Sequence, residues 1–154
     1  MELKSYQKKV IADLTRYLEL LNETKNYEAA FRFFWQEKSA PTLGYYQDIL
    51  PGVPNLCFKV PTGGGKTFIA CNAIRPIFDA LPVTKTKAVV WLVPSDAILA
   101  QTVKALKDTQ HPYRQKIGGF WRARGGLHQA GAFERAELQS HCRHRTAFHH
   151  GAVL

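Results

Sequence analysis

The sequence predicts an α/β protein in which a parallel β-sheet follows an N-terminal helical segment. Two apolar runs, 56–60 and 88–93, are each followed by a helix-like run, at 66–80 and 97–108. This β-α-β-α order implies parallel strands joined by right-handed crossovers. The chain has 154 residues, of which 45% are hydrophobic and 21% charged, enough for one soluble domain with its own core.

The N-terminal segment is predicted to form two helices. Residues 3–21 carry apolar side chains at three- and four-residue spacing, the repeat of a helix with one buried face. A polar break at 22–26 separates them from 27–36, an aromatic-rich run that we expect to be a second helix. Its aromatic rings could stack on nucleic-acid bases, but packing against the sheet explains them better because aromatic side chains bury large areas. Proline and glycine predict loops at 39–44 and 51–54.

A glycine-rich turn between the first predicted strand and its helix is the most informative part of the chain. It runs Val60-Pro61-Thr62-Gly63-Gly64-Gly65-Lys66-Thr67. Strand, glycine-rich turn, Lys-Thr and helix together have the layout of a P-loop, which holds nucleotide phosphates. The glycines allow a tight turn that brings backbone N–H groups close to phosphate oxygens, and the helix that begins near Lys66 adds the positive end of its dipole. An ordinary glycine-rich turn before a helix is the alternative.

Two side chains of this turn have predicted chemical roles. Lys66 would bridge the β- and γ-phosphates of a nucleotide, and the hydroxyl of Thr67 would ligate Mg²⁺. A nucleoside triphosphate and Mg²⁺ are therefore the expected cofactors. The residues expected to hold them are Thr62, Gly63, Gly64, Gly65, Lys66 and Thr67.

The second predicted strand leads into another helix. Residues 88–93 form a continuous apolar and β-branched run, typical of a parallel strand buried on both faces. Pro94-Ser95-Asp96 then turns the chain into the helix at 97–108, with Ser95 or Asp96 as its N-cap.

Three motifs carry a resemblance to a known family. Val60 stands where the general P-loop has its first glycine, and with an apolar residue there the turn resembles motif I of superfamily-two helicases and translocases more than the P-loop of a kinase or GTPase. Tyr6-Gln7 is similar to an aromatic-glutamine pair upstream of motif I in these proteins. Pro94 to Gln101 resembles motif Ia, although Asp96 stands where a basic residue is usual.

In this order the motifs resemble the first RecA-like domain of DEAD/DEAH-box-type helicases, and most closely the N-terminal part of the restriction (Res) subunit of type III restriction enzymes. The resemblance implies a partial RecA-like fold over 1–116, with Gln7 reading an adenine edge, since an amide both donates and accepts hydrogen bonds. It implies that Pro94 and Ser95 lie along DNA, expected to be duplex, with a modification methyltransferase subunit as a further partner. A surface glutamine and a plain strand-to-helix turn are the respective alternatives.

Parts of the family's catalytic machinery have no counterpart in the sequence. No Asp-Glu-x-His or Asp-Glu-Ala-Asp run, the Walker B motif that helps to hold Mg²⁺ and positions the attacking water, occurs in the 154 residues. The arginine fingers belong to a second RecA-like domain, and an arginine finger alone contributes about 10³–10⁵ in rate. We therefore expect ATP binding without turnover. The alternatives are another P-loop NTPase, such as a kinase, and a remnant without independent function.

Charge and cysteine content favour a nucleic-acid partner and a reducing compartment. The formal net charge of +9 favours a polyanion, although the lysines are scattered. The chain has neither an apolar run of membrane-spanning length nor the apolar core of a signal peptide near its start. Three cysteines without a CxxC pair then predict a cytoplasmic setting and no membrane partner.

The composition changes after residue 116. Residues 1–116 hold 12 Lys and 4 Arg, whereas 117–154 hold no Lys, 5 Arg and five of the six His. We therefore divide the chain into a helicase-like part, 1–116, and an atypical Arg-, His- and Gly-rich tail, 117–154. Within the tail only 131–139 is helix-like, and the spacing of its Cys and His residues fits no closed zinc site. We hypothesise that the tail is a frameshifted or disordered segment, with a genuine variable region as the alternative.

Overall fold

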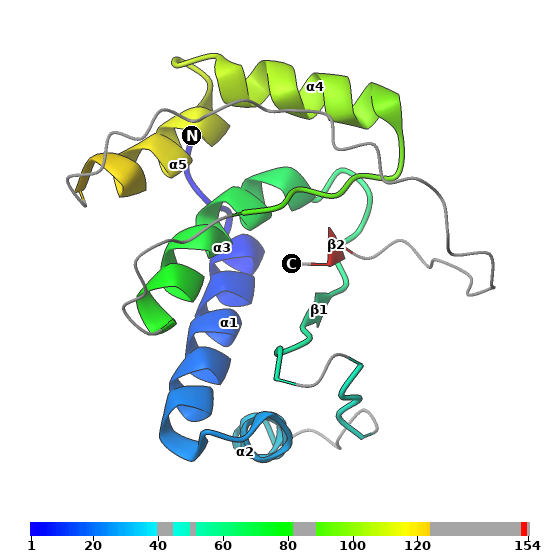
Figure 1. Ribbon diagram of the computed structural model, residues 1–154, viewed down its shortest axis with the longest axis vertical. Helices are drawn as coiled ribbons and strands as arrows, with labels where there is room; N and C mark the ends of the chain where they lie inside the picture. The colour runs from blue at the N-terminus through cyan, green and yellow to red at the C-terminus, as the bar shows by residue number, and fades with distance from the viewer. Residues whose placement is uncertain (40–44, 50–51, 82–88, 124–151, 154) are drawn as a thin grey trace.

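The computed structural model describes residues 1–39, 45–49, 52–81, 89–123 and 152–153. Its elements are α1 (Ser5–Thr24), α2 (Tyr27–Glu37), β1 (Cys57–Phe58), α3 (Lys66–Ala80), α4 (Asp96–Lys107), α5 (Pro112–Ala123) and β2 (Ala152–Val153). Helix α1 lies beside α3, with α2 at one end of the molecule and α4 and α5 at the other (Figure 1). The tail helix predicted at 131–139 and the tail cysteine and histidines fall outside the described residues.

The core is built on α1 and α3. Leu14 and Leu18 of α1 are buried against Ala73 of α3, and partly buried apolar side chains surround them: Ile11, Leu56, Phe58, Ile77 and Ala80. The C-terminal ends of the two helices are also joined, since Asn22 Nδ2 donates a hydrogen bond of 3.0 Å to the carbonyl of Ala80. This bond satisfies one of the last α3 carbonyls, which have no partner within their own helix.

Helix α2 covers another face of α1 with its aromatic side chains. Tyr17 and Leu20 of α1 are buried with Ala30 of α2, and Phe31 and Phe34 pack against them. Tyr17 and Phe34 meet edge to face, with ring centroids 6.4 Å apart. The expectation that the aromatic residues of this helix serve packing is confirmed for Phe31 and Phe34, although they pack on a helix rather than on a sheet.

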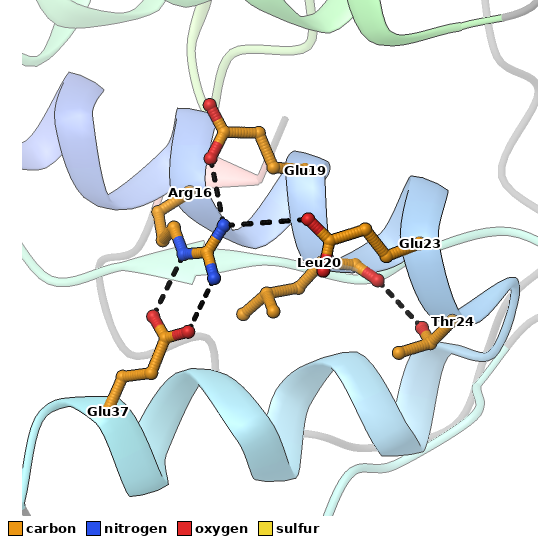
Figure 2. Close-up of polar contacts among 6 residues, drawn as sticks. All are labelled: Arg16, Glu19, Leu20, Glu23, Thr24 and Glu37. Carbon is orange, nitrogen blue, oxygen red and sulfur yellow. Dashed lines mark hydrogen bonds and ion pairs between the residues drawn. The ribbon is translucent and has the colours of Figure 1, made fainter.

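An arginine on α1 pairs with the last residue of α2. Arg16 donates from Nε and Nη2 to the two carboxylate oxygens of Glu37, at 2.9 and 2.5 Å, and its Nη1 lies 3.0 Å from Glu19 and 3.8 Å from Glu23 (Figure 2). The hydrogen bond to Arg16 lowers the pKa of Glu37. The fork-to-fork geometry specifies orientation more than it adds stability, because water screens charges at an exposed site.

The described residues do not form the predicted parallel sheet. The strand pairing that they contain joins β1 to β2 in antiparallel register, Cys57 opposite Val153 and Phe58 opposite Ala152. Residues 89–93, predicted as a buried strand, are not in a strand, and Val90 and Leu92 are 80% and 71% exposed. A strand buried on both faces needs hydrogen-bonded strands beside it, and among the described residues none lies next to 89–93.

Two helices follow their sequence predictions closely. Helix α3 has the predicted bounds, 66–80. Helix α4 begins at Asp96, one residue before the predicted start, and Ser95 is its N-cap: the Ser95 Oγ accepts a hydrogen bond of 3.4 Å from the N–H of Ile98. No helix among the described residues combines the length and the apolarity that crossing a bilayer requires.

Two other helices differ from prediction. Helix α1 continues to Thr24, so the polar break shortens to Lys25, whose left-handed conformation at φ 53° ends the helix, and Asn26. Asn26 caps α2 by accepting a hydrogen bond of 2.9 Å from the N–H of Ala29. Helix α5 was not predicted, and it continues across 116/117, where the sequence suggested a division that stays a prediction.

Because its thiol is buried, Cys71 is expected to make the free energy of unfolding fall at alkaline pH. Burial on α3 raises the pKa of Cys71 from 9.0 to about 12. A raised folded-state pKa gives a contribution that is complete below about pH 9 and is lost as the pH rises toward about 12. We expect urea midpoints to fall over this range by more in the wild type than in Cys71→Ala; equal losses would contradict the assignment.

Candidate functional site

The glycine-rich turn after β1 is a tight turn that leads directly into α3. Gly63 and Gly65 have φ angles of 76° and 72°, the left-handed region that glycine enters at little cost. The N–H of Gly64 donates to the carbonyl of Pro61 at 3.0 Å, which closes the turn. Gly65 is the N-cap residue of α3, and its carbonyl accepts the N–H of Ile69 at 3.0 Å. The turn thus delivers the N-terminus of α3 to the loop.

The surroundings of Gly64 and Gly65 also leave little room for a side chain. A Cβ atom on Gly64 would lie 2.6 Å from Cγ1 of Val60 and 2.9 Å from the carbonyl oxygen of Pro61. A Cβ atom on Gly65 would lie 2.7 Å from Nε2 of Gln7. Val60, the residue in the first-glycine position of the motif, therefore packs directly on the loop that it introduces.

Lys66 holds its ammonium group over the same loop. Its Nζ donates to the carbonyls of Val60 and Pro61, both at 3.1 Å. Thr67 follows in the first turn of α3, and Thr62 is exposed on the turn. A cation, N–H groups at a helix N-terminus and a hydroxyl form a donor set suited to a polyphosphate with its metal ion, so these residues fit Mg-ATP.

The structure brings Tyr6 and Gln7 onto this turn. Gln7 is only 3% exposed, and its Nε2 donates to the carbonyl of Gly64 at 3.0 Å and to the Tyr6 hydroxyl at 3.3 Å. Its Oε1 accepts the N–H of Lys4 at 2.9 Å. The Tyr6 hydroxyl in turn donates to the Gly64 carbonyl at 2.8 Å. The predicted aromatic-glutamine pair therefore contacts the predicted P-loop backbone.

Pro94 and Ser95 lie at the start of α4 and are exposed. The Ser95 hydroxyl accepts the N–H of Ile98 as a helix cap. This role is what the alternative of a plain strand-to-helix turn predicts. The contact with nucleic acid stays a prediction.

The contact between α5 and the first turn of α3 was not predicted from the sequence. The rings of Phe68 and Tyr113 stack with centroids 5.9 Å apart, and His111 meets Tyr113 edge-on at 4.5 Å. Two signals were available: Pro112 stands at the first helical position, where proline is favoured, and Tyr113 and Ile117 are four residues apart.

The conformation of Gly65 gives a testable difference between two glycines. Gly65→Ala should lower the free energy of unfolding by about 1–2 kcal/mol, because an alanine in the left-handed region is strained and its Cβ meets Gln7. Gly118→Ala is the control, since Gly118 lies in α5 and a methyl group added there would have no atom within 4 Å. The control should raise the free energy by about 0.5–1 kcal/mol. Urea titration measures both, and equal values would contradict the assigned geometry.

One comparison with known proteins returns a match. The sequence profile of the family described as "Type III restriction enzyme, res subunit" matches residues 1–141. This range includes Tyr6-Gln7, the glycine-rich turn and Pro94-Ser95, and it extends past residue 116. No curated protein and no solved structure matches the chain.

Proposed function

The chain belongs to the family of type III restriction enzyme res subunits, and we propose that residues 60–67 bind Mg-ATP as the nucleotide site of a DNA helicase or translocase. Members of this helicase-type family have a RecA-like P-loop fold, generally use ATP and Mg²⁺ and act on DNA. The kinase alternative gains no support from the structure or from the family.

The observation that carries the proposal is the geometry of the glycine-rich turn. Gly63 and Gly65 take up positive φ angles on either side of Gly64, and the turn ends at the N-terminus of α3. Lys66 then places its ammonium over the loop. A glycine-rich turn that does not bind phosphate would not be expected to combine a cation, a helix N-terminus and a following hydroxyl.

Each side chain of the turn has a proposed part in holding the nucleotide. Lys66 would exchange the carbonyls of Val60 and Pro61 for charged phosphate oxygens, and hydrogen bonds between charged groups are the stronger ones. The Thr67 hydroxyl would ligate Mg²⁺, and Thr62 would line the turn. When bound, Mg-ATP supplies the phosphoryl group whose transfer to water drives movement on DNA in such proteins.

We propose further that the 154-residue polypeptide binds ATP without turning it over. Its sequence contains no Asp-Glu-x-His run to position the attacking water. The test measures the melting temperature with and without Mg-ATP, together with phosphate release. A ligand of the folded state raises the melting temperature. No shift at millimolar Mg-ATP would indicate a remnant without function, and phosphate release that Lys66→Ala abolishes would overturn the proposed lack of turnover.

The proposal also covers DNA as a partner and the cellular compartment of the protein. The net charge of +9 supports a polyanionic partner, and we propose that Pro94 and Ser95 lie along duplex DNA. A methyltransferase subunit as partner, a cytoplasmic setting and the division at 116/117 complete the proposal. Genomic DNA read in all frames past codon 117 tests the division, because an intact frame in related strains would remove the frameshift hypothesis.

A further inference from the structure

The strand that leads into the glycine-rich turn is paired with residues from the far end of the chain. β1 and β2 run antiparallel, with Cys57 opposite Val153 and Phe58 opposite Ala152 (Figure 1). Among the described residues, these two strands form a sheet of their own. A strand edge without a partner leaves backbone N–H and C=O groups unpaired, so β2 supplies the partners that β1 needs on this edge.

β1 connects the hydrophobic core to the candidate nucleotide site. Phe58, together with Leu56 just before the strand, packs against the buried cluster that joins α1 to α3. Two positions after Phe58, the carbonyl of Val60 accepts a hydrogen bond of 3.1 Å from Lys66 Nζ. Contacts that fix the backbone of β1 therefore also restrict the place from which the glycine-rich turn starts.

The partner strand lies outside the part of the chain that the family profile matches. That match covers residues 1–141, and β2 begins at Ala152. The sequence predicted a frameshifted or disordered tail, whereas residues 152–153 have a defined partner in the structure. A strand added to a sheet edge gains its affinity mainly from main-chain hydrogen bonds. A segment of unusual composition can therefore take this place.

We propose that residues 152–153 are a latch: they close the edge of β1 within the same chain and so hold the strand from which the glycine-rich turn starts. The pairing joins two residues to two residues. The latch can therefore open while the packing of α1 on α3 stays intact. Opening it should loosen β1 and weaken the binding of Mg-ATP, and this one consequence rests on the proposed function of the turn.

Cys57 allows the register of the latch to be trapped. Residues opposite each other in an antiparallel pair have Cα atoms about 4.5–5.5 Å apart, within the range of about 4.4–6.8 Å that a disulfide spans. Cys57 is exposed, whereas Cys71 is buried. In a Cys142→Ser background, Val153→Cys should therefore form an intramolecular disulfide with Cys57 under oxidised glutathione. A non-reducing gel and mass spectrometry of peptides identify the product.

Ala152→Cys in the same background is the matched control. Position 152 lies opposite Phe58, and neighbouring positions of a strand lie on opposite faces. This variant should cross-link to Cys57 about ten-fold more slowly, because a disulfide needs the two Cβ atoms to face each other. Equal rates would mean that the tail meets Cys57 at random and would overturn the latch. A disulfide-linked dimer as the main product would also overturn it, since residues 152–153 would then pair with a second copy.

Proline substitutions measure what the latch does for β1 in the absence of nucleotide. One of the two opposed pairs exchanges N–H···O bonds, and proline has no N–H. Ala152→Pro combined with Val153→Pro removes the β2 donor whichever pair holds it, so amide hydrogen exchange in β1 should become several-fold faster. His149→Pro combined with His150→Pro places the same two prolines before β2 and should leave the exchange unchanged. Equal exchange in the two double variants would overturn the latch.

Titration with Mg-ATP separates the latch from the proposed function. The double proline variant at 152 and 153 should bind Mg-ATP about 3–10-fold more weakly than the wild type, and the cross-linked chain should bind at least as tightly. Unchanged affinity in the proline variant would overturn the link between the latch and the turn. If the wild-type chain does not bind Mg-ATP, the proposed function fails, and the disulfide and exchange rates then decide whether the latch exists.

Discussion

Lys66→Ala should weaken Mg-ATP binding on the order of 100-fold, because a hydrogen bond to a charged group contributes about 1.5–3 kcal/mol and about 1.4 kcal/mol is a factor of ten. In the free chain the ammonium is bonded to the carbonyls of Val60 and Pro61 at 3.1 Å, so it already stands over the loop. Little reorganisation is then needed for a phosphate to meet it. Calorimetric titration with Mg-ATP measures the loss.

Lys59→Ala is the control for the loss of one positive charge. Lys59 is exposed and immediately precedes the glycine-rich motif. If general attraction between a basic chain and an anion explained binding, the two variants would lose similar affinity. A specific site predicts less than a threefold change for Lys59→Ala, since exposed charges are strongly screened. Equal losses would therefore contradict a P-loop role for Lys66.

The part of the site within one stretch of sequence was predictable. The spacing of glycines, Lys66 and Thr67 defines a turn and the start of a helix through local backbone preferences, and α3 has the predicted bounds. The partners of the turn were less accessible to sequence reasoning. Gln7 and Gly64 are 57 positions apart, and only the packing of α1 along α3 brings them together. The sequence suggested that Gln7 belonged near the nucleotide, but the group that it contacts depends on that packing.

Phe68→Ala should lower the free energy of unfolding by about 3–5 kcal/mol, the usual cost of removing a fully buried aromatic side chain. Phe68 is 0% exposed and stacks on Tyr113 of α5, so its removal leaves a cavity between two helices. A domain of this size is stabilised by only about 5–15 kcal/mol. Chemical denaturation followed by circular dichroism should show a much earlier midpoint.

The control for this substitution is Phe33→Ala on α2. Phe33 is 41% exposed, so its loss should cost about 1 kcal/mol or less. A similar midpoint for both variants would mean that α5 does not cover Phe68. If Phe68→Ala also weakens Mg-ATP in proportion to its loss of stability, the first turn of α3 depends on α5 for its order.

The predicted sheet and helix α5 show which features a local sequence pattern does not determine. Residues 88–93 have the composition of a buried strand, but composition cannot supply the neighbouring strands, and the described part of the run is exposed apart from partly buried Trp91 and Val93. Trp91 instead packs against Ile74 and Phe78 of α3. The composition changes at 117, inside α5, whereas the helical spacing of Tyr113 and Ile117 continues across 116/117.

The pairing of α1 with α3 has a consequence for synthesis on the ribosome. Leu14 and Leu18 leave the ribosome before Ala73, which they pack against and which follows Leu18 by 55 positions. At about 5–20 residues per second, that interval lasts roughly 3–11 s. Helix α2 can cover Tyr17 and Leu20 almost at once, whereas the strip carrying Leu14 and Leu18 stays open to chaperones until α3 has been translated. Codons that slow elongation between α2 and α3 should therefore lower the yield of folded chain.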